Sequence, residues 1–326
     1  MKKELTNLDF LRACAVLFVV FDHTVKYTFG VEHLGFVSMH YLGRLGVLFF
    51  FVHTSCVLMM SLERQNGEGL FGRFYVRRAF RIYPLSIIAV AAALVGPRAP
   101  SLSPDVWVAN FALVQNFTGN ENAFGALWSL PIEVQMYLLL PFCFLLATRF
   151  RSIVPLFSLW AVATGLALEP HINWHLGPLL YAPCFVPGVI AYVLFKRRVS
   201  RVPAILWPVA IAFITLAFLY RPSLGWQACV TCLALGTLAP FFHQLRHSIV
   251  TSAAAQIAKY SYGIYLSHNL LLIWMRPTAR TLPLFLLVLA AVSILSFHTV
   301  EQPLIRLGQQ FTKKQAVALK AEPVLP

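Results

Sequence analysis

Long apolar stretches dominate the chain, and each is close to the length at which an α-helix crosses a lipid bilayer. A helix rises 1.5 Å per residue, so about 17–25 apolar residues span a hydrocarbon core of roughly 30 Å. Ten stretches fall in this range, at residues 8–28, 43–62, 79–96, 128–148, 152–168, 178–195, 203–220, 224–242, 258–275 and 281–300. We therefore predict an all-α, polytopic transmembrane helix bundle with about ten spans.

The composition excludes a water-soluble fold. The 326 residues are 59% hydrophobic and 12% charged, whereas soluble domains carry about 45–50% apolar and 25% charged residues. The solvent of this chain must be lipid. A net charge of +14 would also suit a nucleic-acid binder, but no recognisable binding module accompanies it. We expect a lipid bilayer, and no nucleic acid, as the partner.

The basic residues predict how the chain is oriented. They cluster between apolar stretches at Lys2–Lys3, Arg77–Arg78, Lys196–Arg198 and Lys313–Lys314. Cytoplasmic loops carry such clusters, so both termini are expected in the cytoplasm and the number of spans is expected to be even. Residues 1–306 then form the membrane domain, and residues 307–326 a short cytoplasmic C-terminal tail. Residues 105–117 are apolar but short, which indicates an interfacial or re-entrant helix.

Neither a disulfide framework nor a metal site is predicted. The six cysteines lie within apolar stretches or, in one case, near the start of one, where they serve as small core residues; they are Cys14, Cys56, Cys143, Cys184, Cys229 and Cys232. His171 and His175 are four residues apart on an expected outer loop, but no third ligand accompanies them. No metal cofactor is expected.

Ionisable residues within spans are costly and mark candidate sites. In the first span Arg12 lies near the cytoplasmic end, and His23 follows eleven residues later, after Asp22. Eleven residues are about three turns, or roughly 16 Å, so Arg12 and His23 project from one face. A neutral imidazole can take a proton from a hydroxyl, although a lone buried histidine can equally be a packed hydrogen-bonding residue.

Two arginines enter the third span from the cytoplasm. Arg78 and Arg81 are three residues apart and share a helix face. Forked guanidinium groups suit phosphates such as those of coenzyme A. The alternative is an ordinary basic cluster at a membrane boundary.

The fourth and ninth spans carry the remaining candidates. Glu133 follows Trp128 within the fourth span, so its carboxylate should be paired or face a cavity. It could orient His23 or hold an acceptor sugar. Tyr265 and His268 lie in the ninth span, where tyrosines can also be interfacial anchors. Glu301 closes the tenth span and can pair with an arginine.

Together these residues resemble the acyltransferase-3 family of integral-membrane acyltransferases, which acylate O-antigen, peptidoglycan, exopolysaccharide, nodulation factor and some macrolides. The matching motifs are Leu8-Asp9-Phe10-Leu11-Arg12 with His23, Arg78-x-x-Arg81, Trp128-Ser129-Leu130-x-x-Glu133, Ser261-Tyr262-x-Ile264-Tyr265-Leu266-x-His268 and Glu301-x-Pro303. One segment departs from the family. Where members usually read Phe-Phe-Val-Leu-Ser-Gly, this chain has Phe50-Phe51-Val52-His53-Thr54-Ser55, which suggests a distinct subgroup.

The resemblance implies an O-acyltransferase in the bacterial cytoplasmic (inner) membrane. An acyl-CoA donor, for example acetyl-CoA, would enter from the cytoplasm with Arg12, Arg78 and Arg81 near its phosphates. His23 and Glu133 would be catalytic, and a saccharide or glycolipid acceptor would meet Asp22, Trp128, Tyr265 and His268. His23 would act either as a general base or through an acyl-histidine.

Two other functions are consistent with a polytopic bundle. A transporter or flippase of a lipid-linked glycan would use the same intramembrane charges to hold its substrate. It would move the glycan without acyl transfer and would not need acyl-CoA. A structural or assembly subunit would explain neither His23 nor Glu133.

Overall fold

The structure is a computed structural model, and it describes residues 5–35, 37–65, 67, 69–119, 121–150, 152–169, 177–197, 199–246 and 248–321. In chain order its main helices are α1 (Thr6–Phe29), α2 (Met39–Arg64), α3 (Leu70–Val95), α4 (Pro104–Ala112), α5 (Ser129–Arg149), α6 (Val154–Leu168), α7 (Gly177–Lys196), α8 (Leu206–Tyr220), α9 (Trp226–Leu238), α10 (Ile249–Met275), α11 (Leu282–Ser296) and α12 (Gln302–Ala321). The described part is all-α apart from a small hairpin, β1 (His33–Leu34) with β2 (Val37–Ser38), which joins α1 to α2.

Each of the ten predicted apolar stretches lies on a helix, but α3 and α10 begin nine residues earlier than predicted. The first turns of both helices are polar on one side, so hydropathy alone does not detect them. In α10 a capping box starts the helix, because the Ser248 side chain accepts from the Thr251 N–H and the Thr251 side chain accepts from the Ser248 N–H. In α3 the early start places Arg73 and Arg77 inside the helix.

Helix length and composition support a membrane protein, while the number of spans remains a prediction. Within the described residues, four segments are long and apolar enough to cross a membrane: Met39–Arg64, Leu70–Val95, Gly125–Arg149 and Leu282–Lys313. Four more apolar segments are shorter. Helices α6 and α8 have 15 residues each, a rise of roughly 23 Å, which is less than the thickness of a hydrocarbon core.

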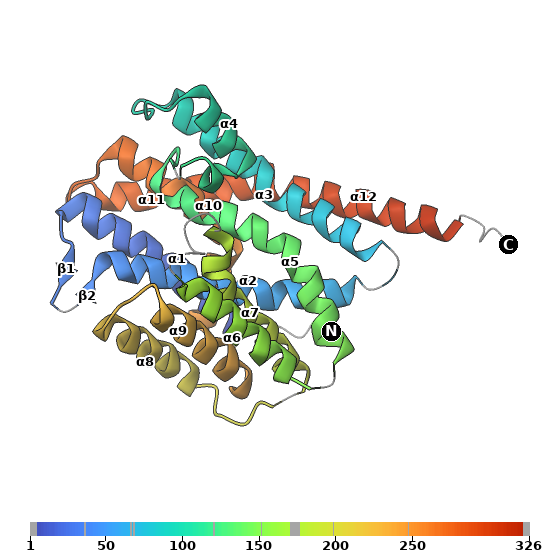
Figure 1. The fold of residues 1–326 in the computed structure, drawn as a ribbon. Helices are drawn as coiled ribbons and strands as arrows, with labels where there is room; N and C mark the ends of the chain where they lie inside the picture. The colour runs from blue at the N-terminus through green and yellow to red at the C-terminus, as the bar shows by residue number, and fades with distance from the viewer. Residues whose placement is uncertain are drawn as a thin grey trace.

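Helix α2 is the centre of the bundle. It packs against α1 on one side and α7 on the other, and it also contacts α5, α8 and α9. Small residues permit the close approach: a Cβ on Gly46 would meet the Ala15 carbonyl oxygen of α1, and a Cβ on Gly188 would collide with Ser55 of α2. Figure 1 shows α1 and α2 side by side, with the β-hairpin at one end of the pair.

Polar side chains fix the ends of the helices that carry the candidate residues. Asn7 is fully buried. Its side-chain amide donates to the His243 carbonyl and accepts from the Leu245 N–H. The main-chain carbonyl of Asn7 accepts from the indole N–H of Trp207. This network holds the beginning of α1. The 3₁₀ turn η2 (Gly125–Trp128), directly before α5, is held on α10, because the Gly125 N–H donates to Asn269.

The segment predicted as an interfacial or re-entrant helix forms α4, which has nine residues and ends at Ala112. It is therefore too short to cross a bilayer. The side chain of Asn110 bonds the carbonyl of Glu121 and the N–H of Ala123, and so folds the following loop back onto α4.

The C-terminal part is one long helical rod with a π-turn in its middle. Helix α11 passes through the π-turn η4 (Phe297–Glu301) into α12. Gly308 of α12 packs against Phe80 of α3, and Arg77 bonds Thr312. The predicted tail boundary at residue 306 thus falls inside a helix. Figure 1 shows the β-hairpin on one side of the bundle and the end of α12 extending from the opposite side. The label that marks the N-terminus is on the same side as the end of α12.

We predict that Gly188→Ala destabilises the protein, because the added methyl group would overlap Ser55 and the Val52 carbonyl. Overpacking of this kind costs about 1–3 kcal/mol or more. Gly165→Ala is the matched control, since a Cβ there meets nothing within 4 Å and alanine favours the helix by about 0.5–1 kcal/mol. Thermal unfolding in detergent should give a lowered Tm for the first variant only; equal Tm values would contradict the close packing of α2 and α7.

Candidate active site

Three adjoining cavities follow α1 from its beginning towards its end. The mouth, of about 410 Å³, is lined by residues including Leu5, Asp9, Arg12, His53, Arg64, Arg81 and Lys259. The chamber, of about 80 Å³, is lined by residues including Arg12, His53, Thr54, Arg78, Arg81, Glu133, Tyr137 and Tyr265. The histidine pocket, of about 30 Å³, is lined by Val19, Asp22, His23, His40, Gly43, Arg44, Val47, Trp128 and Tyr265. Arg12, His53, Val57 and Arg81 line both mouth and chamber; Val47 and Tyr265 line both chamber and histidine pocket.

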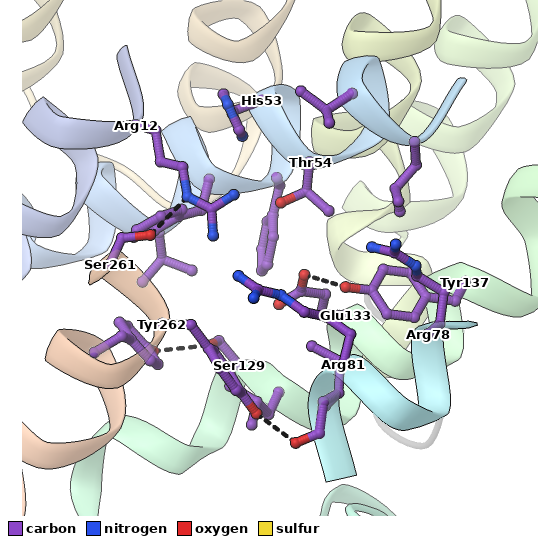
Figure 2. Close-up of a pocket in the computed structure, with 18 residues that line it drawn as sticks. Arg12, His53, Thr54, Arg78, Arg81, Ser129, Glu133, Tyr137, Ser261 and Tyr262 are labelled. Carbon is purple, nitrogen blue, oxygen red and sulfur yellow. Dashed lines mark hydrogen bonds between the residues drawn. The ribbon is translucent and has the colours of Figure 1, made fainter. Parts of the chain in front are cut away.

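The three predicted arginines meet in the chamber, although they come from two helices far apart in sequence (Figure 2). Arg12 of α1 donates from Nε to Ser261 Oγ of α10 at 2.6 Å. Arg81 of α3 forms an ion pair with Glu301, with Nη1 and Oε2 2.9 Å apart. The prediction that Glu301 pairs with an arginine is thereby confirmed.

The π-turn explains how Glu301 reaches Arg81. An α-helix at this point would rotate the following residues differently, and π-turns occur frequently at functional sites. Here the turn directs a fully buried carboxylate from the helical rod towards α3. The buried ion pair therefore holds Arg81 at the boundary of mouth and chamber.

Glu133 and Arg78 both line the chamber. The Tyr137 hydroxyl, one helical turn along α5, donates a hydrogen bond to the Glu133 carboxylate. The Nε of Arg78 is buried with no hydrogen-bond partner among the described residues. Three guanidinium groups meet two carboxylates here when Glu301 is included, so the chamber keeps one excess positive charge. Because Arg12 and Arg81 also line the mouth, this charge favours an anionic group where the two cavities meet.

His23 and His268 form a directed hydrogen-bond chain. Nδ1 of His268 lies 2.7 Å from the Tyr265 carbonyl oxygen and 3.1 Å from that of Ile264. Carbonyl oxygens only accept, so this Nδ1 carries the proton and the neutral ring has its lone pair at Nε2. His23 Nδ1, 2.8 Å from that Nε2, is then the donor. The lone pair of His23 is therefore on its own Nε2, the nitrogen 3.6 Å from Asp22 Oδ2.

Asp22 is pressed against α2 beside His23. A Cβ on Gly43 would collide with its carboxylate, so glycine is what leaves room for Asp22. The other carboxylate oxygen, Oδ1, is buried without a hydrogen-bond partner among the described residues. A buried carboxylate next to an imidazole stabilises the imidazolium that forms when the ring takes a proton.

Arg44 and Trp128 close the histidine pocket on its other side. The Arg44 guanidinium carbon lies 3.9 Å from the centre of the Trp128 ring, a cation–π contact. Because the pocket is only about 30 Å³, a group that fills it must touch several of its walls at once. The pocket thus offers a proton acceptor and a guanidinium to one reacting centre.

Tyr265 separates the chamber from the histidine pocket. Its hydroxyl donates to the Ala126 carbonyl at 2.8 Å and lies 2.7 Å from Ser129 Oγ. The phenol group is thus already engaged within the protein, and the ring forms a wall of both cavities.

The structure brings the predicted residues together in two groups rather than one. Glu133 lies with the arginines, and His268, not Glu133, is the hydrogen-bond partner of His23. His268 is fully buried, so it contacts His23 rather than open space. Four further residues line these cavities, and the sequence motifs assign a role to none of them: Arg44, His40, Tyr137 and Ser129. Two of them could have been found from the motif of the fourth span, because Ser129 belongs to it and Tyr137 follows Glu133 by four residues.

No metal centre is evident in the described ranges: no group of three or more His, Cys, Asp or Glu side chains there could hold a metal ion. The cysteines of these ranges are all free. His171 and His175, the weak metal signal of the sequence, lie outside the described residues.

Comparisons with known proteins assign the family. A family model described as an acyltransferase domain matches residues 5–298, nearly the whole chain. The chain belongs to the acyltransferase-3 family. It is also similar to nodulation protein 10 of Rhizobium leguminosarum bv. viciae, with 24% identity over 363 aligned positions that cover 92% of this chain and 93% of the relative. No solved structure gives a significant match. Family and apolar helices together make this protein a membrane acyltransferase, which favours the enzyme over a transporter.

We predict that Glu301→Ala lowers the stability of this acyltransferase markedly. The substitution leaves the Arg81 side chain, which is 17% exposed, without its carboxylate partner, and breaking a buried ion pair costs up to about 3–5 kcal/mol. The double variant Arg81→Met/Glu301→Leu removes both charges and should regain much of the lost Tm in detergent, but not acyl transfer. If the double variant were as unstable as Glu301→Ala, the ion pair would not be the cause.

Proposed function

We propose that this protein transfers an acyl group from acyl-CoA to a hydroxyl of a cell-envelope or secreted saccharide, with His23 as the general base. The observation that carries the proposal is a series of hydrogen bonds from the Tyr265 carbonyl through His268 to His23. These bonds leave the lone pair of the His23 ring on Nε2. Supporting it is the row of cavities that leads from three arginines to that nitrogen. We further propose ten spans with both termini in the cytoplasm of a bacterium.

The donor enters by the mouth in this scheme. Arg12, Arg78 and Arg81 supply positive charge for its phosphates, and the excess charge of the chamber favours an anion over a neutral ligand. The chamber is too small for a nucleotide but suits the thin arm of the donor. Its acyl thioester then passes Tyr265 and reaches the histidine pocket.

The reaction needs one proton acceptor and no resident cofactor. His23 Nε2 takes the proton of the acceptor hydroxyl while the oxygen bonds the thioester carbonyl carbon. The carbon–sulfur bond then breaks, and the thiolate takes the proton back from the His23 imidazolium. Acyl ester and coenzyme A thiol are the products. General base catalysis of this kind contributes about 10²–10⁴-fold.

Neighbouring groups assist by position and charge. His268 holds the His23 ring and its tautomer, so we assign it a positioning role in place of the substrate contact predicted from the sequence. Asp22 stabilises the imidazolium, and Arg44 stabilises the negative charge that develops on the carbonyl oxygen. Trp128, stacked on Arg44, offers the acceptor sugar an aromatic surface. Glu133 keeps the arginines in place and, with Tyr137, borders the path of the donor.

Transfer of labelled acetyl tests the proposal directly. Membranes with wild type should move radiolabelled acetyl from acetyl-CoA onto envelope glycan, and membranes with His23→Ala should lose this transfer by at least about 10²-fold. His243→Ala is a matched control, because that side chain is exposed and lines neither the chamber nor the histidine pocket. Full transfer by a folded His23→Ala protein would disprove the role of His23.

The positioning role of His268 has its own test. His268→Leu should lower kcat about 10²-fold with little change in the KM for acetyl-CoA, because the mouth and chamber remain intact. His268→Gln should recover part of kcat, since an amide oxygen can accept the hydrogen bond of His23 Nδ1. Equal losses in the two variants, at equal thermal stability, would show that His268 matters for packing alone.

A further inference from the structure

His53 of α2 is the residue at which this chain departs from the usual family segment, and it lies at the boundary of the mouth and the chamber. It is buried in α2 with 2% exposure, and its Nδ1 has no hydrogen-bond partner among the described residues. Burying an imidazole nitrogen without a hydrogen-bond partner is costly. The neighbouring Ser55 shows the contrast, because its hydroxyl bonds the Phe51 and Val52 carbonyls of its own helix. His53 therefore has unused hydrogen-bonding capacity.

The position of His53 indicates which part of a bound ligand could form a hydrogen bond with its free nitrogen. It is one of four residues that line both mouth and chamber, with Arg12, Val57 and Arg81; we call these four the neck. A ligand that occupies both the mouth and the chamber would therefore lie against these four residues. Figure 2 shows Arg12 and His53 on the same side of the chamber, while Arg81 comes from α3 opposite.

The chemistry of the neck points to a phosphate. Two guanidiniums provide forked donors at fixed positions, since Arg12 is held by Ser261 and Arg81 by Glu301. Forked guanidinium groups match phosphate oxygens in geometry and charge. A neutral imidazole adds one N–H donor without further charge. The amides of a donor's arm would need acceptors as well as donors, and the two arginines offer none.

We propose that His53, with Arg12 and Arg81, binds the diphosphate of the acyl donor at the neck. This inference rests on the proposed function, because it assumes a donor of the acyl-CoA type. It divides the donor between the cavities: the nucleotide lies in the mouth of about 410 Å³, the diphosphate at the neck, and the acyl-carrying arm in the chamber. Arg78 lines the chamber but not the mouth, so this division places it next to the arm and revises the phosphate contact given to it above.

Two donors of different length separate this role from all others. Acetyl-CoA carries the diphosphate, whereas acetyl-pantetheine has the same arm and thioester without it. We expect His53→Leu to raise the KM for acetyl-CoA about tenfold to a hundredfold, the usual effect of losing one charge-assisted hydrogen bond. The KM for acetyl-pantetheine should be unchanged. His53→Gln keeps an N–H donor and should show a smaller rise.

Controls keep the test independent of folding and of catalysis. His33→Leu makes the same substitution at an exposed residue of β1, and should alter neither KM. The dissociation constant of coenzyme A, measured by calorimetry in detergent beside that of pantetheine, gives a readout without turnover. It should rise with His53→Leu for coenzyme A only.

Any other result contradicts either the role of His53 or the proposed acyl transfer, and the measurements show which of these two proposals fails. An equal rise in KM for both donors would place His53 against the arm, and no rise would leave it without a role in donor binding. If wild type binds coenzyme A but transfers acetyl from neither donor to any glycan, the proposed function fails. The two dissociation constants would then still decide whether His53 contacts a diphosphate.

Discussion

Charge buried in an apolar bundle has to be paired or has to face a cavity, and most of this structure is arranged around that requirement. Arg81 and Glu301 satisfy each other across α3 and the π-turn, and Arg12 is anchored on Ser261 of α10. The helical rod from α11 to α12 is thereby tied to α3, and α1 to α10. The same requirement creates the cavities, because the arginines, Glu133 and Asp22 keep apolar side chains from filling the space between them.

Two chemically distinct regions result, joined along one face of α1. In the proposed function the region of Arg12, Arg78 and Arg81 binds negative charge, and the region of His23 moves a proton. Tyr265 lies between them and is held by Ala126 and Ser129. Such separation suits a transfer reaction in which a large anionic donor must be held at one place while its acyl group reacts at another. Arg12 and His23 both lie on α1, so one rigid helix fixes the position of the two regions relative to each other.

The helices and the identity of the chamber arginines could be predicted, and most contacts could not. Apolar stretches of the right length reveal helices because the signal is local. The same signal missed the first nine residues of α3 and α10, where polar turns and a capping box decide the start. Glu133 was recognised as a residue that needs a partner, but its place among the arginines, and not beside His23, depends on how far α5 reaches into the bundle.

The sequence by itself determined an all-helical membrane protein, its family motifs, and the common face of Arg12 and His23, since these follow from hydropathy and from the helical repeat within one segment. Tertiary structure alone decided that His53 stands at the neck with a nitrogen that has no partner in the described part of the chain. It also decided that His23 meets His268, that Arg81 meets Glu301 and that Arg44 stacks on Trp128. These pairs join different helices, in two cases more than 200 residues apart. Their distances depend on side-chain packing between helices, which glycines such as Gly43 and Gly188 set, and no local pattern encodes that packing.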